Sequence, residues 1–112
     1  MKKEVSIYSS IDKITQMHRT QFVYSDRETI IFDNDFNDII PVEKIRGCVI
    51  NVIFGDRFNH ESINNLPDHI RHITLGRGFD IPITKIPKDL ESIRVYQSYP
   101  HDLPGKILIT IY

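Results

Sequence analysis

The sequence lacks tryptophan and alanine, has one cysteine, and contains no apolar run long enough for a membrane helix. Such a helix needs about 18 or more consecutive apolar residues, and the polar N-terminal segment gives no sign of a signal peptide. A single cysteine excludes an internal disulfide and fits a reducing compartment, so we expect a cytoplasmic protein. Alanine and leucine favour helices, whereas isoleucine, which far outnumbers leucine here, suits strands. The chain is therefore predicted to be mainly strand and turn.

The charge of the chain favours neither a nucleic-acid nor a membrane partner. Of the 112 residues, 26% are charged, and the formal net charge is -1. That is ordinary globular usage, without the basic excess that a polyanionic partner requires. With 40% hydrophobic residues, the chain can form one domain around one core.

Sequence motifs give no reason to expect catalysis. Cys48 stands beside the apolar run at 49–54 and is predicted to be a buried, inert thiol. Neither a His–Asp pair to activate it nor a Ser–His–Asp or paired-carboxylate pattern stands out, so no catalytic residue or cofactor is expected. The less favoured alternative is a small enzyme with its site where the N-terminal segment meets the rest of the chain.

The main signal is an internal repeat of about 21 residues. An aromatic or apolar residue recurs at spacings of 22, 21 and 21, at Phe32, Phe54, Leu75 and Tyr96. A phenylalanine followed by Asn or Asp recurs at Phe36-Asn37, Phe58-Asn59 and Phe79-Asp80. An apolar residue followed by proline recurs at Ile40-Pro41, Leu66-Pro67, Ile86-Pro87 and Leu103-Pro104. Landmarks that share one period indicate stacked structural units.

Each unit carries an L-x-x-L-x-L pattern whose last two positions alternate as in a half-buried strand. The pattern reads Val49–Val52–Phe54, Ile70–Ile73–Leu75 and Leu90–Ile93–Val95. One unit cannot close a core by itself, so neighbours should stack about 4.8 Å apart with their strands in a parallel sheet. The predicted fold is mainly β: a short, leucine-rich-repeat-like, right-handed solenoid with parallel strands and an N-terminal β-hairpin cap.

Stacking places equivalent side chains in columns. Val52, Ile73 and Ile93 should form one apolar column, Phe54, Leu75 and Val95 a second, and Phe36, Phe58 and Phe79 an aromatic spine. The polar residues after these phenylalanines, Asn37, Asn59 and Asp80, should form a structural ladder, because short polar side chains accept backbone N–H bonds at turns. Gly55, Gly76 and Gly78 are interpreted as turn glycines at positive φ, not as a phosphate loop.

Two segments resemble FNIP repeats, a divergent leucine-rich-repeat class named for its Phe-Asn-Ile-Pro tetrad. They are FNHESINNLPDHIRHITLG at 58–76 and FDIPITKIPKDLESIRVY at 79–96, and the best tetrad is Phe79-Asp80-Ile81-Pro82. The resemblance covers about 32–112. It implies a protein-interaction role, and such repeats are familiar from slime moulds and amoebal giant viruses, which would make the location host cytoplasm if the chain is viral. They often follow an F-box, and no helical F-box pattern is visible here.

The array is expected to form one folded domain with a cap. Residues 1–31 are the predicted capping segment, and the repeats are placed at about 32–53, 54–74, 75–95 and 96–112. Within the cap, residues 21–24 and 29–32 flank a polar turn and predict a β-hairpin. Residues 4–8 alternate as in a strand, and 10–18 are compatible with a short helix or an irregular loop.

The chain ends in ILITIY, an uncharged strand with nothing after it to cover its edge. Such an edge tends to pair with another chain. The predicted self-association residues are Ile107, Ile109, Ile111 and Tyr112, in a homodimer or with a partner strand. The alternative is that this is simply the last coil, with its edge shielded by twist.

The strand side chains that point away from the core are predicted to form an exposed ladder that binds a partner. These residues are Asn51, Ile53, His72, Thr74, Ser92 and Arg94. His69 and His72 do not converge on a strand as they would on a helix, so no metal site is expected. The favoured function is a non-enzymatic protein–protein interaction module whose partner the sequence does not identify. The alternative is a self-associating structural protein that pairs through its C-terminal edge strand.

Overall fold

The computed structural model describes residues 22–105 and 107–112, which contain six strands and no α-helix. The strands are β1 (Phe22–Asp26), β2 (Thr29–Phe32), β3 (Asn51–Ile53), β4 (His72–Thr74), β5 (Ser92–Val95) and β6 (Leu108–Ile111). Two short 3-10 helices, η2 (Val42–Lys44) and η3 (Glu61–Asn65), lie in the connections. The segments predicted at 4–8 and 10–18 lie outside the described residues.

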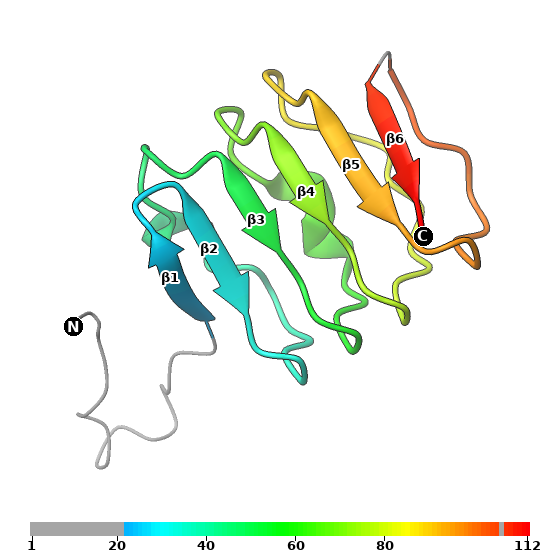
Figure 1. The fold of residues 1–112 in the computed structure, drawn as a ribbon, viewed down its shortest axis with the longest axis horizontal. Coiled ribbons are helices and arrows are strands. Elements are labelled where there is room, and N and C mark those ends of the chain that lie inside the picture. The colour runs from blue at the N-terminus through cyan, green and yellow to red at the C-terminus, as the bar shows by residue number, and fades with distance from the viewer. Residues whose placement is uncertain (1–21, 106) are drawn as a thin grey trace.

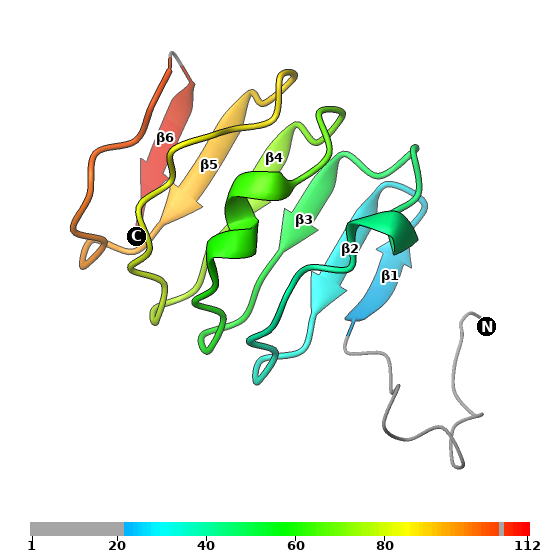
Figure 2. The same ribbon diagram turned by 180° about the vertical axis from the view of Figure 1, so that it is seen from behind.

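The strands form a single sheet in sequential order from β1 to β6. β1 pairs with β2 antiparallel, and every later pair is parallel. After each parallel strand the chain returns behind the sheet, where η2 and η3 lie, and winds as a right-handed coil (Figures 1 and 2). Thr29, Asn51, His72, Ser92 and Leu108 are aligned across the sheet, so one coil takes 22, 21, 20 and then 16 residues. The predicted mainly β, right-handed solenoid with an N-terminal hairpin is confirmed.

The hairpin turns at Arg27 and Glu28, inside the predicted polar turn. β1 is longer than expected because it continues to Asp26, where the register with β2 shifts by a bulge. The Asp26 carboxylate accepts a hydrogen bond from the Glu28 N–H at 2.8 Å. This contact closes the turn locally, as is common for aspartate in tight turns.

The core lies between the sheet and the returning segments, and its columns are those predicted. All nine of their side chains are at most 5% exposed. The Phe58 ring stacks on Phe36 at 5.8 Å and on Phe79 at 5.9 Å. The spine continues beyond its predicted end, because Tyr99 stacks on Phe79 at 5.8 Å and donates its hydroxyl to the Ile81 carbonyl. Each buried side chain of this size contributes roughly 1.5–3 kcal/mol relative to exposure.

The predicted polar ladder also forms. The Asn59 N–H donates to Asn37 Oδ1 at 2.8 Å, and the Asp80 N–H donates to Asn59 Oδ1 at 3.0 Å. A second ladder on the neighbouring turns joins the Asp56 N–H to Asn34 Oδ1 and the Arg77 N–H to Asp56 Oδ1. Each of these hydrogen bonds pairs a turn N–H that is left unpaired by the sheet and by any helix. The bonds therefore fix the spacing between neighbouring coils.

The prediction that Gly55, Gly76 and Gly78 adopt a positive φ was wrong. Among the glycines, all of which are described, only Gly105 has a positive φ, of 79°. Gly55, Gly76 and Gly78 are instead needed for close stacking of backbones. A Cβ on Gly76 would lie 2.4 Å from the Gly55 carbonyl oxygen, and one on Gly78 would lie 2.3 Å from that of Asp56. The absent side chain therefore allows neighbouring coils to approach.

The prediction that Cys48 is buried was also wrong. Its side chain is exposed, and Sγ donates to the Arg27 carbonyl at 3.0 Å. Cys48 lies in the turn before β3, where the alternation of the strand has not begun. Val49, the next residue, takes the buried position.

Candidate functional site: the exposed face of the sheet

The six predicted ladder residues lie together on one face of the sheet in two straight rows. Strand pairing aligns Asn51, His72 and Ser92 in one row, and Ile53, Thr74 and Arg94 in the other. Arg94 is exposed and the other five are half-buried. Neighbouring strands are about 4.8 Å apart, so the rows present closely spaced side chains. We call this surface, made of these six residues, the strand face.

The strand face continues in both directions beyond the predicted residues. Thr29 aligns with Asn51 and Ile31 with Ile53. At the other end, Leu108 aligns with Ser92 and Thr110 with Arg94. These four positions were missed because the outward alternation was followed only within the three clear L-x-x-L-x-L patterns. Counting back from the first pattern and forward from the last would have identified them.

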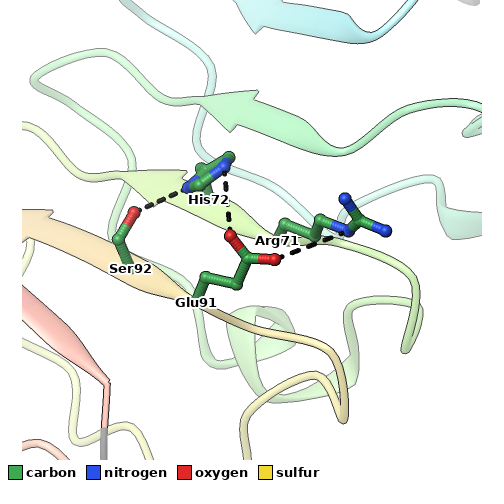
Figure 3. Close-up of polar contacts among 4 residues, drawn as sticks. All are labelled: Arg71, His72, Glu91 and Ser92. Atoms are coloured by element: carbon green, nitrogen blue, oxygen red, sulfur yellow. Dashed lines mark hydrogen bonds and ion pairs between the residues drawn. The ribbon is translucent and has the colours of Figure 1, made fainter.

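The centre of the strand face is a polar cluster around His72 (Figure 3). Nδ1 of His72 lies 2.7 Å from Ser92 Oγ, and its Nε2 lies 3.9 Å from Glu91 Oε1. The second carboxylate oxygen of Glu91 lies 3.8 Å from Arg71 Nε. The side chains that contact one another in this cluster are about 20 residues apart in the sequence. No sequence motif therefore indicates it.

A serine, a histidine and a glutamate in contact suggest acyl transfer, but their geometry does not support it. Glu91 lies beyond hydrogen-bond distance of His72, and its side chain is 58% exposed. The Ser92 N–H donates to the Arg71 carbonyl at 3.1 Å. An oxyanion needs free, convergent donors at the nucleophile. The cluster is suited to polar recognition, because it offers exposed donors and acceptors.

A second cluster combines arginine and tyrosine at the C-terminal ends of β4, β5 and β6. The guanidinium of Arg94 lies 4.8 Å from the Tyr112 ring centroid, and that of Arg77 lies 5.3 Å from the Tyr96 ring. The two rings are 4.2 Å apart. The Tyr112 hydroxyl donates to the Leu75 carbonyl at 2.9 Å. Cation–π stacking holds both guanidinium planes in place, and stacked arginines are common in protein interfaces.

Burial raises the pKa of Tyr112. Tyr96 adds to this rise, whereas the Arg94 guanidinium opposes it. Burial also raises the pKa of Tyr99, where the Ile83 backbone opposes the rise and Asp80 adds to it. Both hydroxyls therefore stay protonated well into the alkaline range, and both continue to donate to their carbonyls.

Two further histidines, His69 and His101, link neighbouring coils. His69 Nε2 lies 3.1 Å from the Arg46 carbonyl, and His101 Nε2 lies 2.8 Å from that of Asp80. His60 Nδ1 accepts the Ser62 N–H at the start of η3. Within residues 22–105 and 107–112, no group of three or more His, Cys, Asp or Glu side chains could hold a metal ion.

The C-terminal strand residues predicted for self-association are placed differently from one another. Ile107 is partly buried against the core. Ile109 and Ile111 continue the core columns of Ile93 and Val95, yet they are 42% and 63% exposed. Tyr112 is 38% exposed, and Leu108, which was not predicted, is 68% exposed. We call β6 and Tyr112 together the C-terminal edge.

The part of the chain that the structure describes contains no helix long and apolar enough to cross a membrane. No curated protein and no solved structure matches the chain. A family model described as FNIP Repeat matches residues 36–78. This range holds two residues of the aromatic spine, Phe36 and Phe58, each followed by a strand, β3 or β4. In sequence, residues 36–78 are therefore similar to FNIP repeats.

Proposed function

We propose that this protein is a non-enzymatic interaction module that binds a protein partner through the strand face. The observation that supports this best is the open, regular arrangement of the face. Its two rows carry amide, hydroxyl, imidazole, guanidinium and aliphatic groups in fixed register. The returning segments with η2 and η3 lie on the opposite side of the sheet (Figures 1 and 2).

The chemistry of the strand face suits a partner with mixed polar and apolar groups. Ile53 and the Thr74 methyl group offer apolar contact, while Asn51 and Ser92 donate and accept hydrogen bonds. Arg94 is exposed and oriented by Tyr112, so its fork can bind a carboxylate of the partner bidentately. Each group is held by a sheet, so little side-chain or backbone entropy is lost on binding.

A repeat solenoid is typical of non-catalytic modules, which supports the same proposal. We also propose a cytoplasmic location. The free, exposed thiol of Cys48 supports it, because such a thiol persists most readily in a reducing compartment.

The test compares two variants with the same change in charge on opposite sides of the molecule. His72→Asp with Arg94→Glu alters the strand face, and Thr84→Asp with Lys85→Glu alters exposed positions on the returning side. Proteins captured by the wild type from a host-cell extract are identified by mass spectrometry, and the affinity of the purified partner is then measured. We expect the face variant to lose the partner and the control variant to keep it. The proposal is wrong if the face variant keeps the partner, or if only the control loses it.

A further inference from the structure

The C-terminal edge gathers most of the exposed apolar surface of the described residues. Six large hydrophobic side chains of the described residues are exposed, and four of them, Leu108, Ile109, Ile111 and Tyr112, belong to this edge. The others, Val23 and Ile39, are isolated from this group in the sequence. A contiguous exposed apolar patch of this kind usually marks a contact site.

The backbone of β6 also offers hydrogen bonds to a further strand. Among the described strands, β6 has β5 as its one neighbour. The Leu108 N–H donates to the Glu91 carbonyl and the Tyr112 N–H donates to that of Val95, both at 3.0 Å. Alternate residues of a parallel strand turn their backbone groups to opposite sides. Ile109 and Ile111 therefore direct their N–H and C=O groups away from β5.

Electrostatics permits a second copy at this edge. No residue of β6 has a charged side chain, and neither does Tyr112. The nearest charge on the sheet is Arg94 of β5, which is stacked on Tyr112. In two edges joined side by side, the two Arg94 residues would be three strand spacings apart, about 14 Å. That exceeds the Debye length of about 8 Å at physiological salt, so their repulsion is largely screened.

We infer that the C-terminal edge binds a second copy of this chain, with the two β6 strands antiparallel about a two-fold axis. A two-fold axis perpendicular to the sheet brings identical edges together and reverses the strand direction. A two-fold axis along the strands would place each residue opposite itself in a parallel pair, where the slanted bonds cannot form. The symmetric arrangement that satisfies the backbone is therefore the antiparallel one.

The outward backbone groups also select the register. In one register Ile109 of each copy pairs with Ile111 of the other, so the outward N–H and C=O groups of both residues form hydrogen bonds in both copies. Thr110 then lies on the two-fold axis. Ile109 and Ile111 then meet on the core side, where each fills the space that a following coil would occupy. On the other side, Leu108 lies opposite Tyr112 of the second copy. Apolar and aromatic cross-strand pairs of this kind stabilise antiparallel sheets.

This arrangement joins two sheets into one and keeps both strand faces on the same side. The dimer would present two copies of Asn51, His72, Arg94 and their neighbours on one continuous surface. Association does not depend on the proposed partner binding, because the pairing uses the backbone of β6, whereas the six residues of the strand face lie on β3, β4 and β5. A partner with repeated sites would gain avidity from the pairing.

Analytical ultracentrifugation over a wide concentration series tests the association. We expect a monomer–dimer equilibrium for the wild type and for Val23→Lys, which adds the same charge to β1, the other terminal strand, at a position 55% exposed. Ile111→Lys places a charge on the pairing edge and should weaken the dimer at least ten-fold. Circular dichroism checks that each variant is folded. A wild type that stays monomeric at the highest concentration, or a dimer that Ile111→Lys leaves intact, would overturn the proposal.

A cysteine crosslink tests the geometry without disturbing the edge. In a Cys48→Ser background, Thr110→Cys places two thiols across the axis in a non-hydrogen-bonded pair, where Cα atoms are about 4.5 Å apart, within disulfide range. Mild oxidation should give a covalent dimer. Thr74→Cys, on the strand face two strands from the edge, is the matched control and should give no covalent dimer. Equal crosslinking of both variants, or none at position 110 in a dimeric sample, would exclude this register.

Discussion

The interior coils and the C-terminal coil place the same kinds of residue in the same columns, with opposite outcomes. Ile93 is fully buried, whereas Ile109, the next member of its column, is 42% exposed. Val95 is 3% exposed, whereas Ile111 beside it is 63% exposed. The burial of a position in this solenoid therefore depends on whether another coil follows. The interior coils bury their apolar side chains, whereas those of the C-terminal edge are exposed.

The two regions also differ in how closely their backbones are held. Interior coils of 20 to 22 residues are fixed by side-chain ladders and by glycines that allow contact. The last coil takes 16 residues, and its link to the coil before uses Tyr99 and His101 with backbone carbonyls. Substitutions in the interior should therefore cost more stability than those in the last coil.

The largest expected effect comes from Gly76→Ala. The added Cβ would lie 2.4 Å from the Gly55 carbonyl oxygen of the preceding coil, so the coils must separate. Overpacking against backbone should cost about 3 kcal/mol or more. Urea denaturation measures the free energy of unfolding. Gly47→Ala is the control, because nothing lies within 4 Å of its Cβ, and it should be neutral or slightly stabilising. Similar losses for both would contradict the stacking role.

A paired truncation in one column should separate the regions directly. Ile93→Ala removes a fully buried side chain and should cost about 3 kcal/mol. Ile109→Ala removes a side chain that is 42% exposed. It should cost about 1 kcal/mol, since the stabilising free energy scales with the apolar area that is buried. Both values come from denaturation at a concentration low enough to keep the chain monomeric. An equal cost at the two positions would show that the last coil is covered in solution.

The polar ladder should contribute less than the core. Asn59→Ala removes the oxygen that accepts the Asp80 N–H, and the amide that donates to the Asp80 carboxylate. Exposure of this turn lets water replace part of the loss, so the expected cost is about 1 kcal/mol. Thermal unfolding by calorimetry provides the measurement. Asn65→Ala, at an exposed position of η3, is the matched control and should have a smaller effect.

The smallest expected effect is a loss of stability at alkaline pH. Burial raises the pKa of Tyr99 and Tyr112 above the ordinary value near 10. The unfolded chain therefore ionises first, so this stability is fully present below about pH 10 and falls as the pH rises through the folded pKa values. Tyr99→Phe with Tyr112→Phe should flatten the fall, measured by denaturation at pH 8 to 11. An unchanged slope would contradict the burial of these hydroxyls.

Much of the fold could be predicted because the repeat reduces it to one coil. The period gave the strand positions, the core columns and the ladder from Asn37 to Asp80, since each depends on spacing alone. Close contacts between the backbones of neighbouring coils could not be predicted from the spacing. Glycine is needed at position 76 because the backbone of Gly55, 21 residues earlier, lies against it. The repeat spacing does not reveal this contact. Cys48 was misplaced because it precedes the alternating strand.

The candidate site, too, could be predicted only in part. The strand face followed from period-2 alternation, and the structure aligns its residues as two rows. The contact of His72 with Ser92 and Glu91 depends on the register between β4 and β5, which no single segment specifies. Tyr99 was missed as a spine residue because it lacks the Asn or Asp that follows each phenylalanine, although its spacing from Phe79 is near the period.

Binding through the strand face is tested most directly by NMR titration of the labelled protein with its captured partner. The largest chemical-shift changes should fall on the backbone and side-chain signals of the strand-face residues, with Ile53, His72 and Arg94 among them. Signals of the returning side, such as Thr84 and Lys85, should stay in place. Changes confined to the returning side or to β6, with the strand face unaffected, would contradict the account.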